Sequence, residues 1–349
     1  MTLNWVQQRP QLVHDQDSTL LHGMRTISNT SGSQTGLKND DSRAGGSQGA
    51  TDEYLKAALL PGAAVHLTKA EARKLRLLDV HTHIGEIAPG KGQTARQLVQ
   101  RMDEEGVERA VVLSIENPEE TYYYVLSKYV IAACRRFRDR LIPFCCVDPR
   151  RGRADTSTDF LGLIERYVRM GAKGFGEYLA GLPVDDPRSM KIYEACGYLG
   201  IPVLLHMDDR RNVDSIGLPA FERVLRTLPQ TIFIVHGPGW WREISSEVEP
   251  GVTYPTGPVK PGGRAKDLLA SFENLYADLS AQSGYNALSR DPSHGVEFLA
   301  EFAGKLLFGT DCIYPGQDLP IVKFFVEAEL PMKQKRRIAH ENAERLLAV

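Results

Sequence analysis

The sequence predicts a (β/α)8 barrel of the TIM type, because short apolar runs alternate with amphipathic segments from Leu77 onward. Strongly apolar strands separated by helices are typical of parallel strands that helices cover on the outside. Repeats of this unit over roughly 270 residues match the usual ~250 residues of such a barrel. The eight apolar runs span residues 77–83, 109–115, 141–147, 172–177, 201–206, 231–236, 274–280 and 305–311.

Helix signals lie between these runs. Thr94 can cap a helix that ends at Gly106, with apolar residues repeating along one face. Residues 160–168 repeat the same apolar pattern, and Gly171 follows it. Both segments are therefore expected to be helices that bury one face against the strands.

Two further helices and the chain end complete the pattern. Asp186-Pro187 and Asp291-Pro292 each combine a helix cap with a proline suited to the first turn. Residues 336–347 are expected to form the last helix. A doubly wound open sheet is the alternative architecture, but no glycine-rich dinucleotide loop follows the first apolar run, which counts against it.

The N-terminal segment differs in composition from the rest. Residues 28–51 are rich in Ser, Gly, Asn, Asp and Gln, and Leu37 is their only large apolar residue. Such a stretch buries too little apolar surface to offset its ordering entropy. We expect residues 1–52 to be a disordered tail and residues 53–349 to form the barrel domain. An over-long assignment of the start codon is an alternative explanation of the tail.

Composition excludes several classes of function. Hydrophobic residues make up 42% and charged residues 25%, as in a soluble globular protein. A net charge of −2 gives no reason to expect a nucleic-acid partner. No apolar stretch approaches the ~20 residues of a membrane span, and the N-terminus carries no Sec-type signal. Five cysteines, with Cys145 and Cys146 adjacent in an apolar run, favour buried free thiols and a cytoplasmic location.

The first apolar run ends in two histidines. Residues i and i+2 of a strand share a face, so His81 and His83 should project side by side, with Asp79 below them. Two imidazoles on one rigid strand form the first half of a divalent metal site. The alternative is a pair of hydrogen-bonded strand histidines.

Four other runs also end in polar residues that can bind a metal. They are Glu177, His206, His236 and Asp311. Active sites of such barrels lie at the C-terminal ends of the strands, so these side chains should surround one mouth. Histidines with a carboxylate suit Zn²⁺ or a similar ion with a water position left open. Taken singly, His206 and His236 would more often be hydrogen-bonded core histidines than ligands.

This set resembles the amidohydrolase superfamily, specifically the amidohydrolase-related branch that includes aminocarboxymuconate-semialdehyde decarboxylase. The resemblance runs over about residues 76–349. The matching elements are Asp79-Val80-His81-Thr82-His83, His206, His236-Gly237 and Phe308-Gly309-Thr310-Asp311.

The resemblance implies that one divalent ion is bound by a set of four residues: His81, His83, His206 and Asp311. It also implies that His236 contacts the bound water or the substrate. Relatives with two ions place a carboxylated lysine or a glutamate at the end of the fourth strand, where this chain has Glu177. That residue can bridge a second ion, bind substrate or pair with a basic group. Zinc is the expected metal, with manganese and cobalt as alternatives.

A metal-dependent hydrolase is the expected function. Asp311 would accept a proton from the attacking water, and His236 would polarise the attacked carbonyl. The same machinery suits a non-oxidative decarboxylase, which is the alternative reaction. A barrel that keeps its metal as structure and only binds a ligand is a third possibility, but the complete set of metal and acid–base residues argues against it.

Substrate contacts are expected on the loops after the fifth and sixth strands. Trp240 and Trp241 can stack on a flat substrate, or pack beneath their loop. Arg210, Arg211 and Arg242 can hold a carboxylate. We therefore expect a small-molecule substrate, carboxylated or cyclic. A homodimer is expected only because many barrels of this family dimerise.

Overall fold

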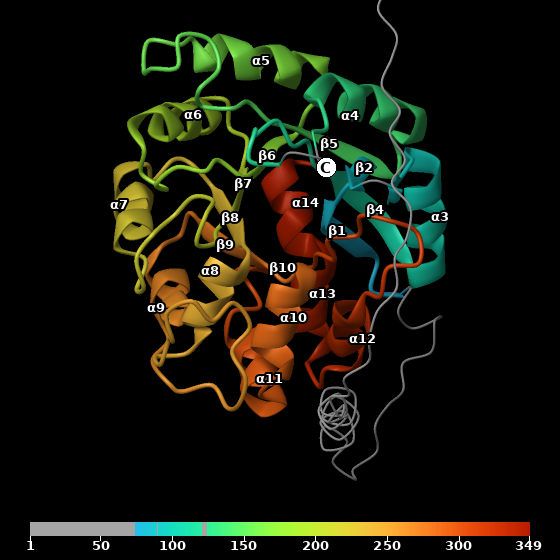
Figure 1. The fold of residues 1–349 in the computed structure, drawn as a ribbon. Coiled ribbons are helices and arrows are strands. Elements are labelled where there is room, and N and C mark those ends of the chain that lie inside the picture. The colour runs from blue at the N-terminus through green and yellow to red at the C-terminus, as the bar shows by residue number, and fades with distance from the viewer. Residues whose placement is uncertain (1–73, 89, 121–123) are drawn as a thin grey trace, which may run out of the picture. The chain divides into compact units, whose positions relative to one another are not determined.

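The central sheet consists of eight parallel strands arranged in chain order (Figure 1). The structure is a computed structural model, and it describes residues 74–88, 90–120 and 124–349. The expected tail, residues 1–52, lies outside these ranges. Each strand overlaps one predicted apolar run, which confirms the predicted barrel. The strands are β1 Leu77–Thr82, β4 Val107–Val112, β5 Leu141–Cys145, β6 Gly174–Tyr178, β7 Val203–His206, β8 Phe233–His236, β9 Leu275–Asp278 and β10 Leu306–Leu307.

The chain that follows β10 returns to β1 and closes the ring. Val80 N donates to Phe308 O at 2.9 Å, and His83 N donates to Cys312 O at 3.0 Å. Between them, Asp311 N donates to His81 O at 2.8 Å. The eighth strand end is thereby held beside the first.

Two apolar cores pack on the two faces of the strands. One fills the inside of the ring, and it includes Leu78, Val111, Phe144, Leu204 and Ile234. Helix α14 (Asn342–Leu347) lies across the middle of the ring in Figure 1, and its Ala343 and Leu347 belong to this inner core. The other core lies between the strands and the surrounding helices.

The helices follow the signals read from the sequence. Thr94 and Gln97 form a capping box, and Gly106 ends that helix at φ 77°. Asp186 and Asp291 each accept a backbone N–H at a helix start. The surrounding helices are α3 Ala95–Glu105, α4 Ser127–Cys134, α5 Phe160–Met170, α6 Pro187–Tyr198, α7 Pro219–Thr227, α9 Arg264–Ser271, α10 Ala281–Ser289, α11 Pro292–Glu301 and α12 Pro320–Glu327.

The C-terminal helix departs from the prediction. It begins earlier, as α13 (Met332–Arg336), and passes through a π turn over Arg337–Glu341 before α14. Ile338 O in that turn accepts the N–H of Phe308 at 3.0 Å. The wider turn thus supplies a hydrogen-bond acceptor for the backbone N–H that follows β10. Single π turns of this kind occur inside α-helices, often at functional sites.

A small hairpin after β1 was not predicted. Strands β2 (Gly85–Ala88) and β3 (Lys91–Gln93) pair antiparallel. A Cβ at Gly92 would lie 2.1 Å from Gly85 O, so only glycine permits this approach. Gln93 then donates to His83 O at 2.9 Å and to Cys312 O at 3.0 Å, which links the hairpin to the closed ends of the ring.

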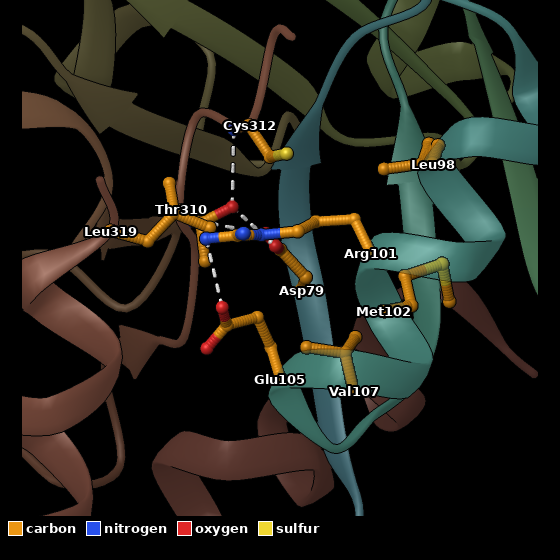
Figure 2. A pocket seen from close by; sticks show the side chains of 9 residues that line it. All are labelled: Asp79, Leu98, Arg101, Met102, Glu105, Val107, Thr310, Cys312 and Leu319. Atoms are coloured by element: carbon orange, nitrogen blue, oxygen red, sulfur yellow. Dashed lines mark hydrogen bonds and ion pairs between the residues drawn. The ribbon is translucent and has the colours of Figure 1, made fainter. Parts of the chain in front are cut away.

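The face of Asp79 also differs from the prediction. The pairing of β1 with β4 shifts register between Asp79 and Thr82, as at a β-bulge. Asp79 consequently points away from the histidines and lines a cavity of about 10 Å³ beside α3, together with Leu98 and Met102 (Figure 2). There the carboxylate accepts the Thr310 N–H at 3.0 Å and the Thr310 hydroxyl at 2.6 Å.

The five cysteines are free and buried, as the sequence predicts for Cys145 and Cys146. Within the described ranges, no helix is both long and apolar enough to cross a bilayer.

Replacing Thr310 by Val tests the closure of the ring. The change keeps a similar side-chain shape but removes the hydroxyl that donates to the buried Asp79 carboxylate. A buried polar group that loses its hydrogen-bond partner costs ~1–3 kcal/mol, so we expect the free energy of unfolding in urea to fall by about 2 kcal/mol. Thr227→Val is the control, because the Thr227 hydroxyl is exposed and donates within α7. Equal losses in the two variants would contradict the closing role.

Candidate metal centre

Six side chains from five places in the barrel converge at the C-terminal ends of the strands. They are His81 and His83 at the end of β1, Glu177 in β6, His206 in β7, His236 in β8 and Asp311 after β10. Most are buried, whereas the Asp311 side chain is 27% exposed and that of His206 is 16% exposed. The barrel therefore brings together every metal or acid–base residue that the sequence singled out.

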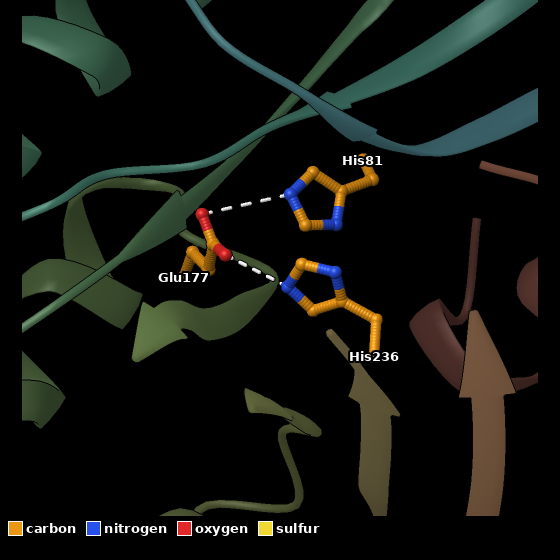
Figure 3. A group of neighbouring side chains, drawn as sticks. All are labelled: His81, Glu177 and His236. Atoms are coloured by element: carbon orange, nitrogen blue, oxygen red, sulfur yellow. Dashed lines mark hydrogen bonds and ion pairs between the residues drawn. The ribbon is translucent and has the colours of Figure 1, made fainter. Parts of the chain in front are cut away.

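The Glu177 carboxylate lies between two pairs of histidines. Its Oε2 is 3.3 Å from His83 Nε2 and 3.6 Å from His81 Nε2. Its Oε1 is 2.7 Å from His236 Nε2 and 3.1 Å from His206 Nδ1. Figure 3 shows one histidine of each pair, with His81 and His236 facing different oxygens of Glu177. Each oxygen thus faces its own pair.

Asp311 approaches the first pair from the opposite side of the ring. Its Oδ1 lies 3.4 Å from His83 Nε2 and 3.6 Å from His81 Nε2. The residue has φ 59°, in the left-handed region that few non-glycine residues adopt. Backbone conformations of this kind persist where surrounding structure holds them, and they gather at functional sites.

The electrostatics of the group favour a cation. Burial lowers the pKa of His81, but the charges of Asp278 and Glu177 outweigh it and raise that pKa well above its usual value. Burial raises the pKa of Glu177, yet the charges of His81 and His236 hold it well below its usual value. For His236, burial and the charge of His81 lower the pKa. The buried carboxylates thus stabilise positive charge on the side chains or ions that lie beside them.

A carboxylate outside the group contacts the other ring nitrogen of His81. Asp278 Oδ2 is 2.6 Å from His81 Nδ1, and Asp278 accepts the Ser280 hydroxyl at 2.8 Å and the Ser280 N–H at 2.9 Å. This contact fixes the ring so that Nε2 faces Glu177 and Asp311. The sequence does not reveal this contact, because pairing between distant strand ends leaves no local pattern.

These donors fit a divalent ion. Two sets of ligand atoms each lie within 4.8 Å of one another: His81, Glu177 and His236 form one, and His81, His83 and Asp311 form the other. Imidazole nitrogens with carboxylate oxygens are the ligands of Zn²⁺ and of similar transition metals. His236 Nε2 lies among the donor atoms, and its expected contact with water or substrate stays a prediction. Neither set includes His206, which the resemblance groups with His81, His83 and Asp311.

The two tryptophans do not offer the predicted stacking surface. The exposed fraction is 0% for Trp240 and 2% for Trp241. Trp240 packs edge-on to Phe221, and Trp241 packs against Phe298 while its Nε1 donates to Asp278 O at 3.1 Å. Both indoles are core residues of the short helix α8 (Pro238–Trp241) and its surroundings.

The arginines after β7 and β8 differ in their exposure and in the carboxylates with which they pair. Arg242 is buried and pairs with Asp209 at 2.7 Å. Arg211 pairs with Asp208 at 2.6 Å and also with Glu120. Arg210 is exposed. Arg210 is thus the most accessible of the arginines predicted to hold a substrate carboxylate.

Known structures share this fold. A TIM-barrel protein of Bordetella bronchiseptica matches with a TM-score of 0.54 at 18% identity, covering 78% of this chain and 99% of that chain. A 5-carboxyvanillate decarboxylase of Sphingomonas paucimobilis matches with a TM-score of 0.53 at 15% identity, covering 79% and 99%. A probable 2-pyrone-4,6-dicarboxylic acid hydrolase of Acinetobacter baumannii matches with a TM-score of 0.51 at 15% identity, covering 78% and 100%.

Sequence comparison identifies the family. Among curated proteins, none matches this chain. The family model described as amidohydrolase matches residues 78–349, which include the barrel strands except Leu77, and every residue of the candidate metal centre. The chain therefore belongs to this amidohydrolase family.

Proposed function

We propose that the protein is a metal-dependent hydrolase acting on a small substrate. The observation that carries this proposal is the Glu177 carboxylate, whose two oxygens face two separate pairs of histidines. Two-metal hydrolytic sites place ions ~3.5–4 Å apart, which a single bridging carboxylate can span. The arrangement supports up to two ions, with zinc as the first choice and manganese or cobalt as alternatives.

The donors divide into two halves that share Glu177. His81, His83 and Asp311 would hold the first ion. His206 and His236 would hold the second. When bound, a divalent ion lowers the pKa of a coordinated water toward ~7 and polarises a substrate carbonyl.

Proton transfer falls to Asp311. Its side chain is 27% exposed, compared with 7% for Glu177 and 0% for Asp278, so it is the carboxylate of the group that substrate and water reach. In this role Asp311 accepts the proton of the attacking water and returns it to the leaving group. With only the first ion bound, His236 instead donates from Nε2 to the attacked carbonyl oxygen.

Decarboxylation is the alternative reaction. Of the three solved structures described above, one is named a decarboxylase and another a probable hydrolase, which leaves both chemistries open for this fold. A decarboxylase needs groups that hold a carboxylated substrate. Arg211 and Arg242 lend this reaction limited support, because each already pairs with a carboxylate of the chain.

Isotope tracing distinguishes the two reactions. A panel of lactones, amides and aromatic carboxylic acids first identifies a substrate that turns over. In H₂¹⁸O, hydrolysis should place the label in the product carboxylate, because water attacks the carbonyl carbon. Release of CO₂, with solvent deuterium appearing on carbon, would instead establish the decarboxylase.

Substitution of Asp311 by Asn tests the proton transfer. The amide oxygen can still occupy the position of Oδ1, but it cannot accept a water proton at neutral pH. We expect kcat to fall by ~10²–10⁴-fold, the usual contribution of general acid–base catalysis. Asp318→Asn is the control, because Asp318 is exposed and follows Asp311 in the same loop. A near-normal kcat in the Asp311 variant, at unchanged metal content, would exclude this role.

A further inference from the structure

We propose that Asp208 is a positioning residue that selects the ring nitrogen with which His206 binds the second ion. The inference rests on the proposed function, because it concerns the half of the metal centre formed by His206, His236 and Glu177. Asp208 follows β7 by two residues, and it contacts the ring nitrogen of His206 that does not face Glu177.

The carboxylate of Asp208 is held in place by its own turn. Its Oδ1 accepts the backbone N–H groups of Arg210 and Arg211, each at 2.7 Å. Its Oδ2 then faces His206 Nε2 at 3.0 Å and the Arg211 side chain at 2.6 Å. The turn therefore directs one oxygen at the backbone and the other at the imidazole.

This contact determines where the hydrogen of His206 resides. An ionised carboxylate only accepts hydrogen bonds, so the nitrogen that faces it, Nε2, carries the hydrogen. A metal ion binds only the neutral imidazole, which has its lone pair on the other nitrogen. In His206 that nitrogen is Nδ1, which lies 3.1 Å from Glu177 Oε1 and 3.2 Å from His236 Nε2.

His81 shows the same device with the ring nitrogens exchanged. Asp278 contacts Nδ1 of His81, which leaves the Nε2 lone pair on the side of Glu177 and Asp311. Each half of the centre thus has one histidine oriented by a carboxylate outside the donor set. Partners of this kind change metal affinity by ~10–100-fold when they are mutated.

Arg211 stabilises the orienting carboxylate. Its guanidinium contacts Asp208 and also pairs with Glu120, which precedes α4. The Arg211 guanidinium and the two backbone N–H groups favour the ionised carboxylate, which can only accept a hydrogen bond from His206.

Asp208→Asn is the informative substitution. The two backbone N–H groups keep the amide oxygen at the position of Oδ1, so the NH₂ group replaces Oδ2 and faces His206 Nε2. A donor at that position favours a lone pair on Nε2 and moves the hydrogen to Nδ1, where it blocks the ligand position. In stepwise Zn²⁺ titrations of the metal-stripped full chain, we expect the second ion to bind 10–100-fold more weakly. Binding of the first ion should remain unchanged.

Two other variants separate positioning from general effects. Asp209→Asn removes the same charge from the adjacent residue, which pairs with Arg242, and should leave both Zn²⁺ affinities unchanged. Asp208→Ala also removes the acceptor for the turn. If Asp208 served only that turn, Asp208→Asn would bind zinc like the wild type and only Asp208→Ala would differ.

The Zn²⁺ titrations can also contradict the inference. Wild-type affinity in Asp208→Asn, or an equal loss in Asp209→Asn, would overturn the inference. An equal loss of affinity for both ions in Asp208→Asn would also overturn it. A wild-type chain that binds a single ion overturns the inference but leaves a one-metal hydrolase in place. A wild-type chain that binds no Zn²⁺ overturns the proposed function as well.

Discussion

Closure of the ring by the chain after β10 is the constraint on which the site depends. The backbone hydrogen bond from Asp311 N to His81 O places a carboxylate beside two histidines that lie far away in the sequence. The hydrogen bonds from Thr310 to the Asp79 carboxylate hold the same two strand ends together on the side that faces away from the histidines. The two residues are 231 positions apart in the sequence. The π turn before α14 serves the same end by accepting the N–H of Phe308.

Charge compensation is the second constraint. A carboxylate as buried as that of Glu177 is costly unless positive charge surrounds it. Four imidazoles satisfy it here, and two of them are in turn held by Asp278 and Asp208. The result is a buried polar centre in which carboxylates stabilise positive charge, and a divalent cation can take the place of the protons on the histidines. The same interactions that make the centre costly without a cation thus make it selective for one.

Much of the barrel could be predicted from the sequence, because apolar runs and helix caps are local patterns. The strand-end histidines, Glu177 and Asp311 could be found for the same reason. The bulge in β1 could not, since it depends on pairing with β4, and it turned Asp79 away from the mouth. Burial of Trp240 and Trp241 also depends on distant partners. The contact of Asp278 with His81 joins strands at opposite ends of the chain, so no local spacing reveals it.

Anomalous diffraction can show whether Glu177 joins two metal sites. Crystals of the full chain grown with Zn²⁺ should be measured on both sides of the zinc absorption edge. We expect two anomalous peaks, one among His81, His83 and Asp311 and one between His206 and His236, each in contact with a different oxygen of Glu177. A fully occupied centre with one peak that Glu177 does not contact would contradict this expectation.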